Sequence, residues 1–168
     1  MEIRALTRAD IDQFQRLRRE RLEREPRAFG ESLAEHDATP TEVFERRLES
    51  SNDDQFVIGA FEAAQLVGMA GFARNLRPKS RHKALIWGVY VQPTFRNLGV
   101  ARGILITLIE RAKMNPHVEK IMLTVAADQV AAKRLYQSLG FEVFGHEKHS
   151  LKVEGAYVDE DHMVLWLR

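Results

Sequence analysis

The chain has 168 residues, of which 45% are hydrophobic and 29% are charged, and its formal net charge is +1. This length and balance predict one domain over residues 1–168 and give no indication of a nucleic-acid or membrane partner. The sequence holds no cysteine, which excludes disulfides, thiolate metal sites and a cysteine nucleophile. No apolar run is long enough to span a membrane or to serve as a secretory signal after Met1, so we expect a cytoplasmic protein.

Hydrophobic periodicity and capping signals divide the chain into helices and strands. The predicted elements are, in chain order, a strand over 2–6, a helix that ends at Pro26, a helix over 40–50, strands over 55–62, 65–75 and 84–91, a helix over 100–112, a strand over 118–126, a helix from the possible cap Asp128 to Leu139, and strands over 141–152 and 157–167. Residues 27–38 are expected to be irregular. The arginines and glutamates of the first helix predict a solvated face, because their signs are mixed. Periodicity alone therefore indicates a mixed α/β domain.

The stretch from Ala84 to Ala112 has the strongest pattern. Ala84–Val91 is apolar and rich in β-branched and aromatic residues, which predicts a strand covered on both faces. A short loop containing Gly99 then leads into an amphipathic helix. The unpaired first amides of a helix, together with its dipole, favour a bound anion such as a phosphate. An ordinary strand–helix connection fits the stretch equally well, since the Rossmann and Walker A patterns are both absent.

Two motifs carry a resemblance to a known family. Arg96-x-x-Gly99-x-Ala101, after a strand that ends in Val-x-Pro, resembles the acyl-CoA-binding motif of the GNAT family of N-acetyltransferases. Downstream, Ala132-x-x-Leu135-Tyr136-x-x-x-Gly140-Phe141 resembles the second signature of that family. The resemblance extends roughly over residues 3–167. It implies an α/β fold of the α+β type, with a mixed, mostly antiparallel sheet that about four helices flank and that splays at the acyl-CoA site.

The resemblance also implies an acetyl-CoA-dependent N-acetyltransferase that acetylates a primary amine of a small molecule or peptide in a ternary complex. Loop amides and arginines would hold the CoA pyrophosphate, and the main chain of the preceding strand would pair with the pantetheine arm. The N–H of Val91, or one close to it, would polarise the thioester oxygen. The implied cofactor-binding residues are Val89, Tyr90, Val91, Arg96, Leu98, Gly99, Val100, Ala101, Arg102 and Gln129.

Tyr136 matches the family tyrosine that protonates the departing thiolate, although its spacing alone also fits a core tyrosine. The general base is open, because Trp87 occupies the position where many relatives have a carboxylate. Solvent could also accept the proton. We expect no metal, since no histidine pair has a recognised ligand spacing. The candidate bases by chemistry are Glu31, Glu35, His82, His146, His149, Glu160 and His162.

The acceptor is the least determined part. The resemblance places the 29–37 segment near the acceptor, although it could equally be a plain surface loop. Acidic residues there and in 157–162 favour a cationic acceptor, and the basic loop 76–82 could meet a CoA phosphate, meet an acidic acceptor or stay solvated. Two rival functions are a non-catalytic acyl-CoA-binding or regulatory domain of the same fold and an unrelated domain that binds another phosphate ligand, such as a nucleotide. A homodimer through a sheet edge is also open.

Overall fold

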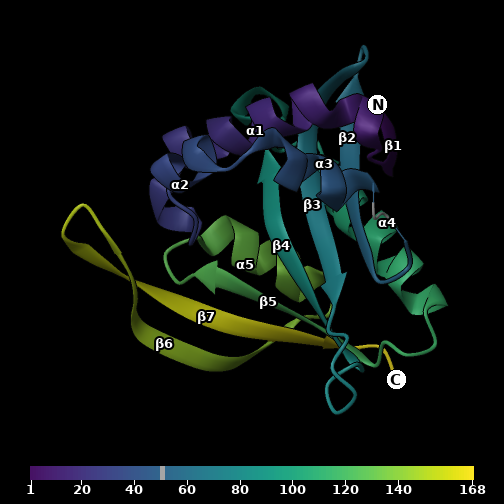
Figure 1. Cartoon of the computed structure of the whole chain (residues 1–168). Coiled ribbons are helices and arrows are strands. Elements are labelled where there is room, and N and C mark those ends of the chain that lie inside the picture. Colours follow the sequence, from purple (N-terminus) through teal and green to yellow (C-terminus); the bar gives the residue numbers. More distant parts are fainter. Residues whose placement is uncertain (50–51) are drawn as a thin grey trace.

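The computed structural model of the protein describes residues 1–49 and 52–168, which form one seven-stranded sheet with helices on both faces (Figure 1). The strands are β1 (Glu2–Ala5), β2 (Gln55–Glu62), β3 (Gln65–Arg74), β4 (Lys83–Val91), β5 (Lys120–Ala126), β6 (Glu142–Val153) and β7 (Ala156–Trp166). The α-helices are α1 (Ile11–Arg24), α2 (Leu33–Ala38), α3 (Thr41–Glu49), α4 (Val100–Met114) and α5 (Val130–Ser138). Single 3-10 turns lie at η1 (Arg8–Asp10), η2 (Pro26–Ala28) and η3 (Pro93–Phe95).

The sheet has two halves that meet at one parallel pair of strands. Its order is β1-β2-β3-β4-β5-β7-β6, and every neighbouring pair except β4–β5 is antiparallel. This confirms the mixed, mostly antiparallel sheet that the resemblance implied. The parallel ladder has only three residue pairs, from Lys83↔Lys120 to Leu85↔Met122. Beyond Leu85 the two strands part, and β4 rises away from β5 (Figure 1).

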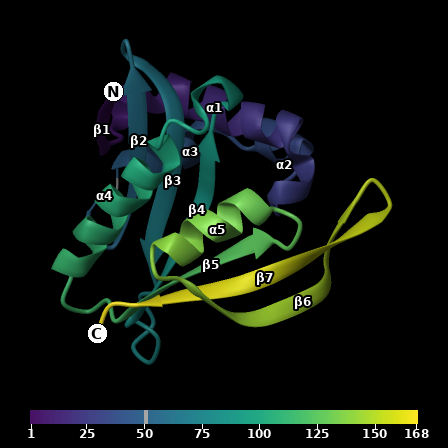
Figure 2. The same cartoon turned by 180° about the vertical axis from the view of Figure 1, so that it is seen from behind.

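Two hydrophobic cores hold the layers together. Helices α4 and α5 cover one face of the sheet, as Figure 2 shows, and the larger core lies beneath them. There the rings of Phe56 and Phe72 stack with centroids 4.7 Å apart. The smaller core lies under α1 and α3, where Phe14 and Phe44 meet edge to face at 6.5 Å. Burying each such ring contributes about 1.5–3 kcal/mol, so these contacts fix both helical layers on the sheet.

The segment 27–38 is not irregular as predicted. It contains α2, and the protein consequently has five α-helices rather than about four in its described residues. The sequence Ser32-Leu-Ala-Glu35 forms a capping box, in which Glu35 accepts from the Ser32 N–H at 2.8 Å and Ser32 Oγ accepts from the Glu35 N–H at 3.2 Å. These bonds satisfy amides that a helix start leaves unpaired, which stabilises a helix of only six residues.

Two other predicted boundaries lie at the start of α5 and at the end of α3. Asp128 was a possible cap of α5, but Gln129 occupies the cap position without a side-chain bond, and Asp128 instead lies 3.5 Å from Arg27. The last residue of the predicted helix over 40–50 and the first of the turn after it, Ser50 and Ser51, lie outside the described residues.

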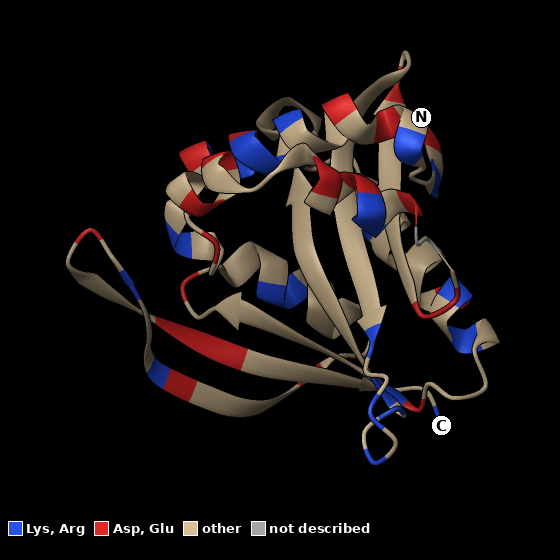
Figure 3. Ribbon diagram, in the orientation of Figure 1, with Lys and Arg blue, Asp and Glu red and all other residues tan. Residues whose placement is uncertain are grey.

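Charge is distributed unevenly over the fold. Charged residues lie mainly on the helices, on the β6–β7 hairpin and in the loop between β3 and β4, whereas β2–β4 have few (Figure 3). The basic loop over 76–82 therefore lies at the start of β4, at the opposite end of that strand from the Arg96–Ala101 loop. Within the described part of the chain, no helix is both long and apolar enough to cross a membrane.

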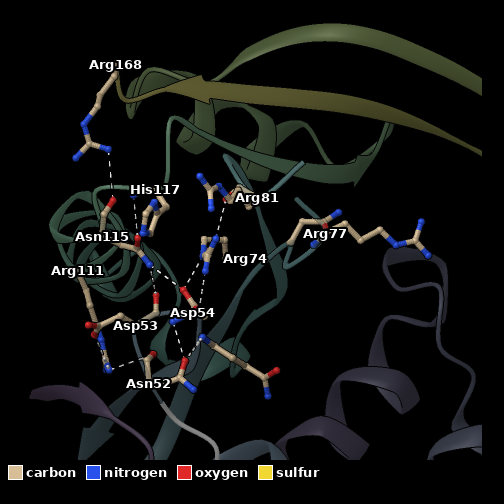
Figure 4. A network of polar contacts seen from close by, with 12 residues as sticks. Asn52, Asp53, Asp54, Arg74, Arg77, Arg81, Arg111, Asn115, His117 and Arg168 are labelled. Atoms are coloured by element: carbon tan, nitrogen blue, oxygen red, sulfur yellow. Dashed lines mark hydrogen bonds and ion pairs between the residues drawn. The ribbon is translucent and has the colours of Figure 1, made fainter. Parts of the chain in front are cut away.

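A polar network closes the end of the sheet where β4 and β5 are still paired (Figure 4). Arg74 donates to both carboxylate oxygens of Asp54, at 2.6 and 2.9 Å. The buried side chain of Asn115, just after α4, donates to Asp54 at 2.9 Å and to the main-chain oxygen of Asp53 at 3.1 Å. Arg168 donates to main-chain oxygens around Asn115. The network joins β2, β3, α4 and the C-terminal residue of the chain.

Substitution of Asn115 tests this network. Asn115→Ala should lower the free energy of unfolding by about 1–3 kcal/mol, because it removes the hydrogen bonds of a buried side chain to Asp53, Asp54 and the His117 N–H. Urea unfolding followed by circular dichroism measures the change. Lys113→Ala, which removes an exposed side chain two residues earlier, should stay within about 0.5 kcal/mol of wild type. Equal midpoints for Asn115→Ala and wild type would contradict a stabilising role.

Candidate functional site

The site begins at a bulge in β4. Trp87 pairs with Gly71 and Tyr90 pairs with Met69, so two residues of β4, Gly88 and Val89, face a single residue of β3. Gly88 has φ +63°, which favours glycine. A bulge leaves its extra residue outside the hydrogen-bonded ladder. Because β5 has already parted from β4 at this level, the bulge borders an open cleft rather than another strand.

The composition of β4 predicted a strand covered on both faces, but the structure leaves part of one face open. Leu85 is 46% exposed, and Trp87, Gly88 and Val89 are only half-buried. Alternate residues Ala84, Ile86 and Tyr90 are buried. Leu85, Trp87 and Gly88 line an open pocket instead of packing beneath a helix. The Trp87 indole packs against Gly71, where an added Cβ would be only 2.0 Å from the ring, so the glycine at position 71 leaves room for it.

A cleft of about 420 Å³, which we call the loop cleft, lies between the end of β4, the start of α4 and α5. It brings together every residue predicted to bind the cofactor except Leu98, which is 68% exposed. The lining residues are Glu25, Val89, Tyr90, Val91, Phe95, Arg96, Asn97, Gly99, Val100, Ala101, Arg102, Gln129, Ala131, Ala132, Leu135 and Tyr136.

Gly99 sets the geometry of this cleft. It precedes α4 with φ +77°, and no atom lies within 4 Å of the position its Cβ would have, so the backbone angle rather than space requires glycine. No side chain caps the helix here. The first amides of α4 therefore lack helical partners and lie at the positive end of the helix dipole, an arrangement suited to a phosphate.

Arg96 has internal partners in the loop cleft. Its Nε donates to the main-chain oxygen of Val91 at 2.9 Å, and its Nη2 donates to Glu25 at 2.6 Å. These bonds tie the loop to β4 and to the end of α1. Arg102 donates to Ser138 Oγ at 2.8 Å, which connects α4 to α5.

A smaller cavity of about 120 Å³, which we call the bridging cavity, lies behind the bulge. Tyr136 lines both this cavity and the loop cleft, as do Val89 and Gln129. Tyr136 is 6% exposed and lies edge-on to Phe141. Burial raises the pKa of its phenol above the ordinary value. The hydroxyl therefore stays protonated at neutral pH and is available as a hydrogen-bond donor.

A third cavity, of about 620 Å³, lies next to the bridging cavity and shares Trp87, Gly88 and Thr124 with it. We call it the arginine pocket. It lies between α1, the segment before α2, α3 and the open face of β4, β5 and β7. Arg18 and Arg21 line it with 3% and 4% exposure, so the prediction of a solvated charged face on the first helix is wrong at these two positions. Glu31 accepts from Arg18 at 2.5 Å and from Arg21 at 2.8 Å. The third arginine of the pocket is Arg47.

Aromatic rings surround these guanidinium groups. Arg21 lies 4.4 Å from the centroid of Phe29, while Arg47 and Arg18 lie 5.0 and 5.5 Å from that of Trp87. Burial lowers the pKa of all three arginines, and burial together with the nearby charge of Arg21 brings the pKa of Arg18 to about 9. The pocket thus concentrates positive charge against an aromatic surface.

Comparison with known proteins identifies the family of this chain. A model of the acetyltransferase (GNAT) domain matches residues 3–163. The chain belongs to the GNAT acetyltransferase family. It is 30% identical over 155 residues to the N-alpha-acetyltransferase RimI of Mycobacterium tuberculosis, a match that covers 92% of this chain and 86% of RimI. It is also 34% identical over 87 residues to the L-amino acid N-acetyltransferase AaaT of Escherichia coli, with 52% of this chain and 53% of AaaT covered.

The solved structures agree with the fold. The yncA acetyltransferase of Salmonella typhimurium, determined with its cofactor acetyl-CoA, superposes with a TM-score of 0.84 at 22% identity over all of this chain and 94% of that one. The expected GNAT fold is therefore confirmed, and the expectation of an N-acetyltransferase agrees with the named relatives. The match with AaaT spans only about half of either chain.

The structure separates the candidate bases of this GNAT domain. Glu31 and Glu160 line the arginine pocket, but Glu31 is held by arginines and Glu160 accepts from Ser150 at 2.5 Å. His162 contacts Thr124, which lines the arginine pocket, with Nδ1 3.2 Å from Thr124 Oγ1. Its Nε2 lies 3.0 Å from Glu147. The candidate bases that line none of the three cavities are Glu35, His82, His146, His149 and His162. No three metal-ligating side chains form a cation site in the described parts of the chain.

The acidic segments that favoured a cationic acceptor have other partners. Glu31 is bound by two arginines, and Glu35 belongs to the capping box of α2. Asp159 accepts from the His149 N–H at 2.8 Å and lies 3.3 Å from His146. These carboxylates are therefore already engaged within the protein, and the net charge facing the arginine pocket is positive.

The arginines of the pocket were the main residues that sequence reasoning missed. A signal existed, because Arg18 and Arg21 follow Phe14 and Leu17 at steps of three and four, on the buried stripe of α1. Arginine on an apolar stripe indicates either a buried ion pair or a ligand site. Arg47 and Thr124 have no comparable signal, since only the fold brings α3 and β5 to the same pocket.

The burial of Arg18 has a measurable consequence. Arg18→Met should raise the free energy of unfolding by about 1 kcal/mol at neutral pH, because it removes a desolvated cation from a cluster with excess positive charge. The folded-state pKa of about 9 lies below the ordinary 12.5, so the unfolded chain binds more protons between these pH values and wild type gains stability as the pH rises through them. The advantage of the variant should therefore shrink above about pH 9.

Denaturant unfolding at neutral pH and at two alkaline pH values measures this effect. Arg24→Met, at an exposed position of the same helix, should stay within about 0.5 kcal/mol of wild type throughout. A large loss of stability in Arg18→Met at neutral pH would show that Arg18 stabilises the fold through Glu31 instead.

Proposed function

We propose that this GNAT protein transfers an acetyl group from acetyl-CoA to a primary amine of a small molecule or peptide, by direct attack in a ternary complex. The observation that carries the proposal is a row of three neighbouring cavities at the splayed strands, which share lining residues. The loop cleft and the bridging cavity share Val89 and Tyr136, and the bridging cavity and the arginine pocket share Trp87, Gly88 and Thr124. A donor at one end and an acceptor at the other would meet at the bulge.

The loop cleft would hold the donor. Its free helix amides and Gly99 suit the pyrophosphate of CoA, with Arg102 beside them, and Arg96 would act by fixing the loop on β4. The pantetheine arm would pair with the main chain of Val89–Val91 as an added strand. The relative yncA was determined with acetyl-CoA, which supports this cofactor for the present chain.

Chemistry would occur at the bridging cavity. The amine nitrogen attacks the thioester carbon, the C–N bond forms, and the C–S bond breaks as the carbonyl is restored. The N–H of Val89, at the bulge, is the group we assign to the developing oxyanion in place of the Val91 amide. Tyr136 would donate a proton to the departing thiolate, since its phenol stays protonated and lines both cavities.

The attacking amine must first lose a proton. Thr124, which lines the bridging cavity and the arginine pocket, begins a chain of hydrogen bonds through His162 to Glu147. We assign this chain as the route by which the proton leaves, with the exposed Glu147 at its outer end. It would replace the carboxylate that Trp87 excludes from β4.

The alternative of a non-catalytic acyl-CoA-binding domain has less support. Such a domain needs the loop cleft but has no need of a second pocket or of a buried phenol between the two. The relatives RimI and AaaT are named as enzymes that acetylate amines. These observations favour catalysis.

Ligand-induced thermal shifts test the donor site and the rival phosphate ligands together. Acetyl-CoA and CoA should raise the melting temperature, whereas ATP and NAD at equal concentration should not, because only a ligand of the folded state stabilises it. Gly99→Ala should weaken the CoA-induced shift strongly. Gly155→Ala is the matched control, since Gly155 also has positive φ and open space around its Cβ but lies in the β6–β7 turn.

Both glycine variants should lose similar stability, about 1 kcal/mol, from the strained backbone. Only Gly99→Ala should lose the response to CoA. A larger shift with ATP than with CoA, or equal responses in the two variants, would reject the donor site.

Tyr136→Phe tests the general acid. It should lower kcat for acetyl transfer roughly 100-fold with little change in the KM for acetyl-CoA, because the phenol acts on the leaving group. Release of free CoA thiol measures the rate. Tyr157→Phe, at an exposed position of β7, is the control. A kcat within twofold of wild type in Tyr136→Phe would make Tyr136 a packing residue only.

A further inference from the structure

The arginine pocket holds more positive charge than the protein neutralises. Arg18, Arg21 and Arg47 line it, while Glu31 is the one carboxylate within 4 Å of their guanidinium groups among the described residues. His36, behind them, has its pKa lowered by burial and by Arg18, which favours its neutral form, so it adds no further positive charge. Among the residues that line the pocket, three arginine cations face two carboxylates, Glu31 and Glu160, and Glu160 is bound by Ser150 rather than by an arginine.

Hydrogen bonding in the cluster is also incomplete. Both side chains are more than nine-tenths buried, yet Nε and Nη1 of Arg18 and Nε of Arg21 have no hydrogen-bond partner among the described residues. Buried donors without acceptors destabilise a fold, and the neighbouring aromatic rings compensate them only partly. A purely structural ion pair would have satisfied them. The excess positive charge and the incompletely paired guanidinium groups together favour an anionic ligand in this pocket.

The pocket lies close to the proposed site of transfer. A Cβ on Gly88 would be 3.0 Å from Arg21 Nη1, and Gly88 precedes Val89, whose N–H we assigned to the thioester oxygen. One residue of strand advances the chain by about 3.3 Å. An anion at Arg21 is therefore only a few bonds from an amine that attacks beside Val89.

We propose that the acceptor is an amino carboxylate, with its amine and its carboxylate a few bonds apart, and that Arg18, Arg21 and Arg47 bind the carboxylate. This inference rests on the proposed acetyl transfer. Guanidinium groups suit a carboxylate because they offer paired donors and a fixed charge. The N-terminus of a peptide lacks this feature, since its α-carboxyl is part of an amide. A free amino acid, α or β, has it.

Acid and amide pairs test the proposal. Initial rates of CoA release are compared for L-amino acids and β-alanine against their carboxamides, and for short peptides with neutral or acidic second residues. At one fixed pH the amide has the larger fraction of neutral amine, so intrinsic reactivity favours it. The protein should nevertheless prefer the acid, with kcat/KM roughly 10- to 100-fold higher, the range expected for charge-assisted hydrogen bonds.

Substitution of Arg47 completes the test. Arg47→Met should reduce kcat/KM for the acid roughly 10- to 100-fold and leave the amide within twofold, and Arg47→Lys should restore part of the loss. Arg8→Met, which removes an exposed arginine paired with Glu45 and Glu49, should change neither substrate. The melting shift with acetyl-CoA should be unchanged in every variant.

Each failure has its own signature. Loss of the acetyl-CoA shift in wild type would reject the proposed function itself. A retained shift with equal use of acid and amide, or with preference for any peptide, would reject the amino carboxylate. If no amine is acetylated, CoA-saturated protein is titrated with N-acetylated amino acids and their amides, and equal or absent shifts would also reject it. Equal losses on acid and amide in Arg47→Met would make the arginines structural.

Discussion

Three parallel residue pairs between β4 and β5 are followed by a gap that no other strand in the described part of the chain fills, and the site depends on this parting. Main-chain groups that leave a ladder need other partners, because buried amides and carbonyls are rarely left unpaired. Here the bulge at Gly88 and Val89 directs β4 toward a cleft where a ligand can supply them. The polar network around Asp54 and Asn115 holds the paired end, so the opening is confined to the other end of the strands.

The two ends of the opening are built from different parts of the chain. The loop cleft depends mostly on main-chain amides, on one positive φ and on the start of α4, so its function requires a backbone path. The arginine pocket depends on side chains from α1 and α3 and on the rings of Trp87 and Phe29. A donor common to a family fits the first construction. An acceptor that differs between members fits the second, since side chains can change while the sheet stays the same.

This difference explains what the sequence could predict. The order of strands and helices followed from periodicity, whereas the sheet topology and the expectation of a donor site at the Gly99 loop came from the family resemblance that the two motifs carry. The motif around Gly99 is local, so its residues are neighbours in sequence as well as in space. Arg18, Arg47 and Thr124 come from three distant segments, and only the fold brings them together. The capping box of α2 was readable from Ser32 and Glu35, but its helix is too short to show a periodic stripe.

Burial of arginine without full pairing also bears on why the pocket has this form. Apolar residues of the same size at 18 and 21 would pack against Phe14 and Phe29 without a desolvation penalty. Two such arginines lower the free energy of unfolding of the free protein. Binding of an anion would restore part of that free energy. Guanidinium groups that are already buried and oriented in the free protein need little rearrangement when a ligand binds. The same desolvation that weakens the free protein therefore strengthens its attraction for a carboxylate.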